Sequence, residues 1–247
     1  MKFVFLSILL IILYSISFSQ GEIEEEKMYN RSENSGSLLL NSNGWGINFR
    51  IGKRLDGYKK RLIDFDFVGI KHPKEQKIHH PSHDEKFVFG KLNSFFTLKT
   101  GYGYQKEIFS KFDKGGIAIK YFYLGGLSLG LLKPVYYEIY DNSNGDQVVN
   151  IQKFDPSSIH TVFDIYGQAS FFDGLNETKI IPGGFLKFGF SFEYGKNDDI
   201  INAIEVGTVL EIFADDIQIM ALNDPNQIFI SLFIAYRYGK TIGTIKD

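Results

Sequence analysis

The stretch Leu186-Lys187-Phe188-Gly189-Phe190-Ser191-Phe192-Glu193-Tyr194-Gly195 alternates apolar with polar or small residues without a break. Successive side chains of a β-strand point to opposite faces, so the leucine, phenylalanines and tyrosine share one face and the lysine, serine, glutamate and glycines share the other. The stretch also has the length of roughly 9 to 11 residues that a tilted strand needs to cross a bilayer. It therefore predicts one strand of a β-barrel that spans a membrane.

The same two-faced pattern recurs along most of the chain. The further segments are Trp45–Gly52, Ile63–Phe67, Val88–Lys99, Ile117–Leu131, Phe163–Gln168, Ile204–Ile212 and Ile228–Gly239. They predict an all-β fold, a closed antiparallel up-and-down transmembrane β-barrel of about eight strands. A short extra strand at Ser37–Leu40, turning through Asn43-Gly44, would raise the number to about ten.

The composition agrees with a β-protein and excludes several functions. The chain has 24 Phe, 14 Tyr and 25 Gly but only 6 Pro, a mixture that favours strands joined by tight turns. Its 27 basic and 29 acidic residues leave a net charge of −2, so we expect no nucleic-acid partner. Because cysteine is absent, disulfides, thiolate metal sites, a cysteine nucleophile and a lipid-modified N-terminal cysteine are excluded.

The N-terminus has the pattern of an export signal. Lys2 precedes an almost wholly apolar run from Phe3 to Phe18, and small residues at positions 17 and 19 precede an expected cleavage point before Gln20. The acidic stretch that follows has no periodicity. We therefore expect a cleaved signal peptide at residues 1–19, a polar arm at 20–43 and the barrel at 44–247.

Two architectures share this alternation, and the polar face distinguishes them. A soluble lipocalin-like barrel turns its apolar face inward, whereas an outer-membrane barrel turns its polar face inward and its apolar face to lipid. Here the polar face combines glycines with charges of both signs, which suits a narrow lumen filled by paired side chains. The predicted lumen charge network is Arg50, Asp64, Asp66, Lys91, Lys99, Lys120, Asp164, Lys187, Glu193, Glu205, Glu211 and Arg237.

Tyrosines near the ends of the apolar face support the membrane interpretation. They are Tyr102, Tyr104, Tyr121, Tyr123, Tyr194, Tyr236 and Tyr238. Tyrosine is enriched at the level of lipid headgroups, so these residues predict an aromatic girdle.

Several segments resemble a known group of proteins. The run Phe229–Lys240 near the C-terminus, with the Ser-Phe-Ser-Gln cleavage region, resembles the small outer-membrane β-barrel proteins of Bacteroidota. Gly44–Arg50, Lys71–Glu75 and Gly130–Pro134 are similar to an uncharacterised group among them. The resemblance implies an outer-membrane barrel and carries over no catalytic residue. The chain departs from the usual terminal aromatic residue, because Lys240–Asp247 extend beyond Tyr238.

An even number of strands beginning and ending in the periplasm would fix the outward loops. On the strands predicted above, these loops would be Leu55–Lys60, Gln105–Gly115, Phe172–Lys179 and Ala214–Gln227. His72–Lys86 and Tyr140–Ser157 would then be periplasmic, although both are long for such turns. The extra strand at Ser37–Leu40 would reverse the assignment.

Two groups of residues are weak candidates for chemistry. His72, His79, His80 and His83 fall in one loop, and imidazoles can ligate zinc, nickel or copper, but their spacing fits no established site. An outer-membrane hydrolase acting on lipid A or phospholipid would need a serine and a histidine, such as Ser157 or Ser158 with His160, or Ser82 with His83. No Gly-x-Ser-x-Gly elbow, Walker loop, dinucleotide fingerprint or His-Glu-x-x-His motif is present.

The sequence thus predicts a non-enzymatic outer-membrane barrel without a cofactor. Its expected partners are outer-membrane lipid and an unidentified protein that binds through the loops. A lipid-modifying hydrolase and a soluble periplasmic lipocalin-like barrel are the alternatives.

Overall fold

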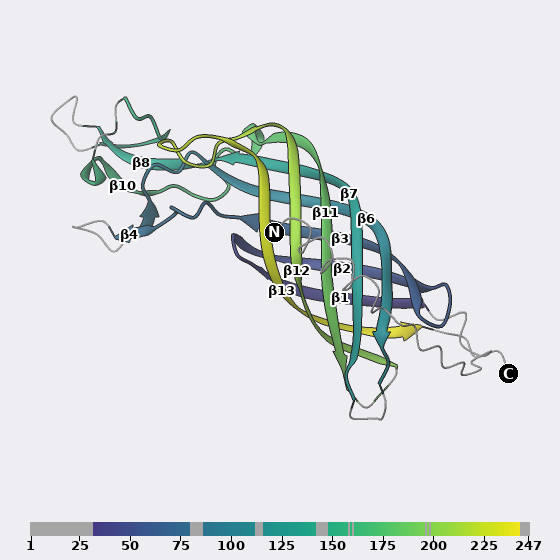
Figure 1. The fold of residues 1–247 in the computed structure, drawn as a ribbon. Helices are drawn as coiled ribbons and strands as arrows, with labels where there is room; N and C mark the ends of the chain where they lie inside the picture. Colours follow the sequence, from purple (N-terminus) through teal and green to yellow (C-terminus); the bar gives the residue numbers. More distant parts are fainter. Residues whose placement is uncertain are drawn as a thin grey trace, which may run out of the picture.

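A computed structural model describes residues 32–79, 86–111, 116–141, 148–157, 159, 161–195, 197 and 199–242. Eight of its strands form a closed barrel in the order β1-β13-β12-β11-β7-β6-β3-β2 (Figure 1). Their bounds are β1 Ser32–Asn41, β2 Gly44–Arg54, β3 Lys59–Ile70, β6 Asn93–Phe109, β7 Ala118–Pro134, β11 Lys179–Tyr194, β12 Ile200–Ile217 and β13 Asn226–Ile242. All neighbouring strands are antiparallel. The predicted fold class and strand number are therefore correct.

The barrel closes through β1, in the segment expected to be mostly a polar arm. β1 pairs with β13 from Ser32 opposite Ile242 to Asn41 opposite Phe233, and with β2 along its whole length. The arm predicted over residues 20–43 is thus wrong from Ser32 onward. The alternation in β1 is weak because Asn34 and Gly36 occupy outward positions, and only Leu38 and Leu40 supply apolar outward side chains.

One predicted barrel strand is absent from the wall, so the total remains eight. The segment Phe163–Gln168 forms a 3-10 turn, η1 (Val162–Asp164), and a short strand, β10 (Ile165–Gln168), that pairs with β8 (Tyr136–Asp141) outside the barrel. Four residues are too few to cross a bilayer. The segment predicted over Val88–Lys99 is also interrupted, because Gly90 adopts a φ of 74° and β6 begins only at Asn93.

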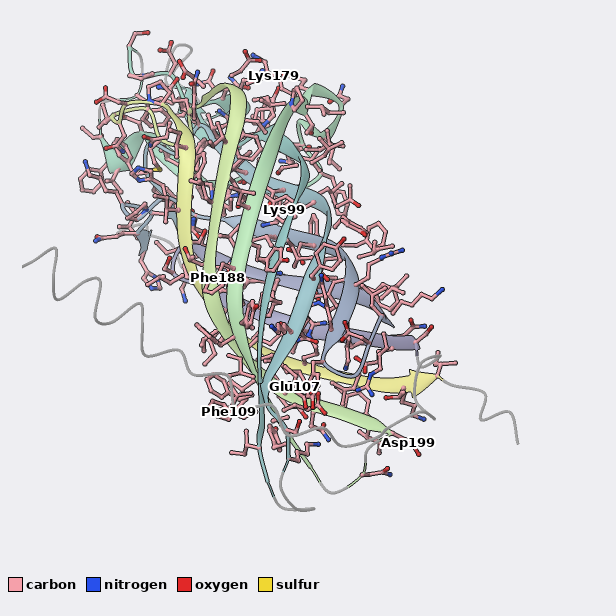
Figure 2. The ribbon with its side chains drawn as sticks, turned by 45° about the vertical axis from the view of Figure 1, so that its right-hand side comes forward. Lys99, Glu107, Phe109, Lys179, Phe188 and Asp199 are labelled. Atoms are coloured by element: carbon pink, nitrogen blue, oxygen red, sulfur yellow. The ribbon has the colours of Figure 1, made fainter. Side chains whose placement is uncertain are left out.

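The two ends of the barrel differ in their connections. One end, the turn end, carries the connections 55–58, 110–117 and 195–199, together with Ser32 and Ile242. The opposite end, the loop end, carries the tight turn 42–43 and the long connections 71–92, 135–178 and 218–225. Figure 2 shows Lys179 at the loop end and Glu107, Phe109 and Asp199 at the turn end.

This arrangement corrects the predicted set of outward loops. Leu55–Lys60 and Gln105–Gly115 lie at the turn end, whereas Phe172–Lys179 and Ala214–Gln227 lie at the loop end, so the four cannot share one side. The predicted loops are on the wrong side because β1 precedes Trp45 and the Phe163–Gln168 segment is not in the wall. Each predicted strand between these two segments therefore runs in the opposite direction.

A second, smaller structure extends beyond the loop end, where the β4, β8 and β10 labels gather in Figure 1. It consists of a β4–β5 hairpin (Lys77–His79 and Lys86–Val88) and a sheet in the order β10-β8-β9, with β9 at Val148–Lys153. We call β4, β5, β8, β9, η1 and β10 the platform. Among the described residues, no helix is both long and apolar enough to cross a membrane.

The platform has its own apolar core. Phe87, Val135, Tyr137, Ile139, Phe154, Ile159 and Ile165 are buried together there. Tyr137 is fully buried, and its hydroxyl donates hydrogen bonds to the carbonyl oxygens of Val88, at 2.7 Å, and Lys91, at 2.9 Å. Burial raises the pKa of this hydroxyl. The platform is therefore a packed structure joined to the barrel.

Candidate functional site: the barrel lumen and the loop platform

The centre of the lumen holds a buried guanidinium between two carboxylates. Arg50 of β2 binds Asp64 of β3 through both Nε and Nη2, at 2.7 and 2.9 Å, and binds Glu205 of β12 through Nη1 at 2.7 Å. All three side chains are at most 4% exposed. The bidentate geometry satisfies the guanidinium fork, which a buried charge requires in order to be tolerated.

Arg237 of β13 completes this cluster from the other side. Its Nε and Nη2 donate to the two carboxylate oxygens of Glu205, at 2.9 and 3.0 Å. The remaining donors reach Ser35 Oγ at 3.0 Å and Asn48 Oδ1 at 2.6 Å. Glu205 is therefore shared by two guanidinium groups.

Strand β11 contributes to the same cluster through Lys187. Its ammonium lies 3.1 Å from Asp66 and 3.7 Å from Asp64. Asn48 links these groups by donating to both aspartates. The central cluster thus pairs Arg50, Arg237 and Lys187 with Asp64, Asp66 and Glu205, so its formal charges cancel.

Two further groups of ion pairs lie along the lumen. Towards the loop end, Lys99 Nζ is 3.3 Å from Glu211. Towards the turn end, Lys120 pairs with Glu193, which also lies 3.4 Å from Lys111. The lumen is therefore lined by paired charges along much of its length.

Ten of the twelve residues predicted for the lumen network lie on barrel strands within these clusters, and two do not. Lys91 precedes β6 and pairs with Glu75 at 2.7 Å, beyond the loop end. Asp164 lies in η1 of the platform, where its carboxylate accepts a hydrogen bond from the backbone of Thr161 at 2.8 Å. Both misplacements follow from the two strand segments that were predicted in the wrong place.

The sequence analysis missed other members of the lumen. Lys60 was assigned to a loop but lies in β3, is buried and pairs with Glu33 of β1. Positions 60, 64 and 66 are all even-numbered, so their side chains share one face of a strand, and this spacing could have assigned Lys60 to the lumen. A layer of aromatic rings was also missed, including Phe95 and Phe213, whose ring centroids lie 5.2 Å apart near the loop end.

A cavity lies on the turn side of the central cluster. Its volume is about 10 Å³, room for about one water molecule, and Glu33, Gln105 and Glu193 are among its lining residues. Arg50, Glu205 and Arg237 also line it. Phe122 is fully buried, and Cζ of the Arg50 guanidinium lies 4.6 Å from the centroid of its ring.

The outward face of the barrel is apolar. Four of its aliphatic side chains are each more than 60% exposed: Leu127, Leu186, Ile230 and Leu232. Figure 2 shows Phe188 on the barrel wall. The soluble lipocalin-like alternative requires the opposite arrangement, with apolar side chains inside and charges outside. It is therefore wrong, because the charged residues are the buried ones.

The predicted tyrosine girdle lies towards one end of the barrel. Tyr104 is opposite Tyr123 in the β6–β7 register, and their ring centroids lie 5.9 Å apart. Tyr194 and Tyr238 both pair with Asn202 near the turn end. These tyrosines place amphipathic rings where the apolar wall meets the turn end.

Five of the candidate metal and hydrolase residues lie outside the described residues: His80, His83, Ser82, Ser158 and His160. Among the residues that the structure describes, no three histidine, aspartate or glutamate side chains converge on one point.

The candidates that the structure describes are His72, Ser157 and His79, which is exposed in β4. His72 Nδ1 accepts a hydrogen bond from the backbone of Lys74 at 3.2 Å. The backbone amide of Ser157 donates to Asp155 Oδ1 at 2.9 Å, which forms an Asx turn, and the Ser157 hydroxyl lies 2.7 Å from each oxygen of the same carboxylate.

No family model matches the chain, and no curated protein matches it. Among solved structures it is similar to Neisserial surface protein A, with 10% identity, 87% of this chain and 96% of that chain covered, and a TM-score of 0.35. It is similar to the N-terminal β-barrel domain of Pseudomonas aeruginosa OprF, with 9% identity, coverage of 86% and 98%, and a TM-score of 0.33. The attachment invasion locus protein Ail of Yersinia pestis, solved with the heparin analogue sucrose octasulfate, shows 8% identity, coverage of 86% and 97%, and a TM-score of 0.37. Similarities this distant leave the function to be argued from the chain's own geometry.

Proposed function

We propose that this chain is an outer-membrane β-barrel that acts as a non-enzymatic structural or interaction component, exported with a cleaved signal peptide at residues 1–19. The observation that carries the proposal is the inverted distribution of polarity. Arg50, Glu205 and Arg237 are buried in the lumen, whereas aliphatic side chains cover the outside of the wall. A closed barrel satisfies its own backbone, so only lipid is needed to cover that wall. The resemblance to outer-membrane barrels of Bacteroidota agrees with this location.

The lumen is proposed to be closed to solutes. A barrel of eight strands has an interior just wide enough for its side chains. The central ion-pair cluster and the aromatic layer with Phe95 and Phe213 fill it in successive levels. In planar bilayers the refolded protein is expected to give no stable single-channel steps. Reproducible steps with a defined conductance would contradict a closed lumen.

The platform is the proposed surface for a partner. Outer-membrane barrels carry short turns on the periplasmic side and longer loops outside, which supports an orientation with the loop end and its platform at the cell surface. The platform is held by its own core and presents Val149 and Ile151 of the edge strand β9, which are 41% and 56% exposed. An ordered surface with exposed apolar side chains is suited to binding another protein.

Site-specific photo-cross-linking in intact cells tests this role. A photoreactive phenylalanine analogue at Gln152, which is exposed on β9, is expected to give an adduct of defined mass. The same analogue at Tyr58, which is exposed at the turn end, is the control on the opposite side of the membrane. An absence of discrete adducts at Gln152, in protein that is correctly inserted, would contradict a role in binding through the platform.

A further inference from the structure

We propose that the connection from the platform to β11 inserts its exposed aromatic side chains into the outer leaflet beside the barrel. This segment, Ser170–Thr178, is called the aromatic loop below. Phe171, Phe172 and Leu175 are 52%, 75% and 46% exposed. Two neighbouring phenylalanines in water are unfavourable, whereas their burial among lipid chains would be favourable. The inference rests on the proposed location of the barrel in a membrane.

The aromatic loop continues the lipid-facing surface of the barrel wall. Phe171 packs edge-on against Phe96 of β6, with ring centroids 6.1 Å apart. Phe96 in turn stacks on Phe67 of β3, at 5.9 Å with the ring planes 7° apart. Phe67 is 36% exposed on the outward face. The rings therefore form one continuous row from the wall to the loop, and lipid that covers Phe67 would also reach Phe171.

The exposure of these rings is built into the loop by its backbone. The amides of Asp173, Leu175 and Glu177 donate to the carbonyls of Ser170, Phe172 and Gly174 at 3.1 to 3.2 Å. Gly174 adopts a φ of 79°, which favours glycine, and a Cβ there would lie 2.6 Å from the Tyr136 ring. These contacts hold the loop backbone in the conformation in which Phe171 and Phe172 are exposed.

Side chains of the platform fix the other side of the loop. Tyr136 of β8 donates its hydroxyl proton to Glu177, and Lys153 of β9 pairs with the same carboxylate. The hydrogen bond from Lys153 and, to a smaller extent, the one from Tyr136 lower the pKa of the Glu177 carboxyl. The loop is therefore attached both to the barrel wall, through Phe171, and to the platform, through Glu177.

An exposed lysine accompanies the rings at the level expected for lipid headgroups, and a buried one packs against them. The buried ammonium of Lys133 lies 4.9 Å from the centroid of the Phe171 ring and donates to the Pro134 carbonyl at 3.1 Å. Lys179 follows the loop directly, is exposed, and stands at the loop end in Figure 2. Aromatic rings with lysines beside them are typical of the interface between lipid chains and headgroups. Such an anchor would hold the platform at a fixed orientation to the membrane.

The single tryptophan of the chain makes the inference directly testable. Trp45 lies on the outward face of β2 and is 56% exposed, so its fluorescence reports whether the barrel wall meets lipid. A second protein carries Trp45→Phe with Phe172→Trp. A third carries Trp45→Phe with Gln76→Trp, an exposed position in the polar β3–β4 connection at the same end. Each is refolded into phosphatidylcholine bilayers with bromine in the upper acyl chains, and folding is checked by heat-dependent gel mobility.

The expected result is that the Phe172→Trp protein loses as much fluorescence to brominated lipid as the protein with native Trp45. The Gln76→Trp protein is expected to be quenched by aqueous acrylamide instead. If native Trp45 is quenched by lipid and the Phe172→Trp protein only by acrylamide, the inserted loop is wrong. If neither is quenched by lipid, the proposed membrane location itself is contradicted. Leu175→Trp in the same background gives the same test if Phe172→Trp does not fold.

Discussion

Arg50 of β2 and Glu205 of β12 meet across the lumen, with 2.7 Å between Nη1 and Oε1, although β1 and β13 separate their strands in the barrel wall. Glu205 also binds Arg237, so one carboxylate is shared by two guanidinium groups that are buried with it. The contact ties the two sides of the barrel together and occupies the middle of its interior.

Replacing this shared carboxylate should be severely destabilising. Glu205→Gln keeps the size of the side chain but leaves the central cluster with one uncompensated buried positive charge, chiefly at Arg237, at a cost of about 3 to 5 kcal/mol in the free energy of unfolding. Urea unfolding of the refolded protein in bilayers measures the change. Asp224→Asn, at an exposed position, is the control and should leave stability unchanged. Equal stability of the two variants would contradict the importance of the central cluster.

Close contact between β6 and β7 should make one glycine irreplaceable. A Cβ at Gly126 would lie 2.0 Å from the Thr100 carbonyl oxygen and 2.7 Å from Gly101 Cα, so Gly126→Ala must push the strands apart. We expect a loss of about 1 to 3 kcal/mol in unfolding free energy, as for other overpacked sites. The matched control is Gly36→Ala, whose Cβ would meet its nearest atom at 3.8 Å. If Gly126→Ala is as stable as Gly36→Ala, the close approach is not present in the folded protein.

The Tyr137 hydroxyl should hold the platform to the barrel. Tyr137→Phe leaves the carbonyls of Val88 and Lys91 without their donor, which costs about 1 to 3 kcal/mol when such groups stay buried. The platform should then become more sensitive to protease while the barrel keeps its heat-dependent gel mobility. Tyr58→Phe, at an exposed turn, is the control. Unchanged proteolysis of the platform would show that these hydrogen bonds do not support it.

Acid should release the aromatic loop from the platform. The pKa of Glu177 is lowered in the folded protein by Lys153 and Tyr136, so its contribution is present above the ordinary carboxyl pKa and is lost as the pH falls through the lowered value. Cleavage within residues 170–178 should therefore accelerate in that acidic range. Glu177→Gln should show the faster cleavage already at neutral pH and little further change with acid. A pH profile identical in the two proteins would contradict this role of the carboxylate.

The sequence predicts the barrel well where both faces carry a strong signal. In β11, Phe188 and Phe190 alternate with Lys187 and Ser191, so lipid and lumen each select their own residue type. In β1 the signal is weak because a narrow lumen accepts Ser35 and Ser37, and outward Asn34 and Gly36 are not apolar. A polar strand of this kind resembles a loop in sequence.

The platform and the long-range pairs could not be derived in the same way. Ile165 and Tyr166 have the alternation of a strand, but only the pairing of β10 with β8 shows that the strand lies outside the wall. The charges of Arg50 and Glu205 were assigned to the lumen from periodicity alone. Their contact depends on the closure of β1 on β13, which brings segments at opposite ends of the chain together.

The most direct test of the whole account is semi-native gel electrophoresis of the outer-membrane fraction, with heated and unheated samples compared. The account predicts that the protein is found in that fraction and migrates differently before and after heating, because the closed barrel resists detergent until it is boiled. A soluble periplasmic protein with the same mobility in both samples would contradict the central claim that an apolar wall faces lipid and the charges face the lumen.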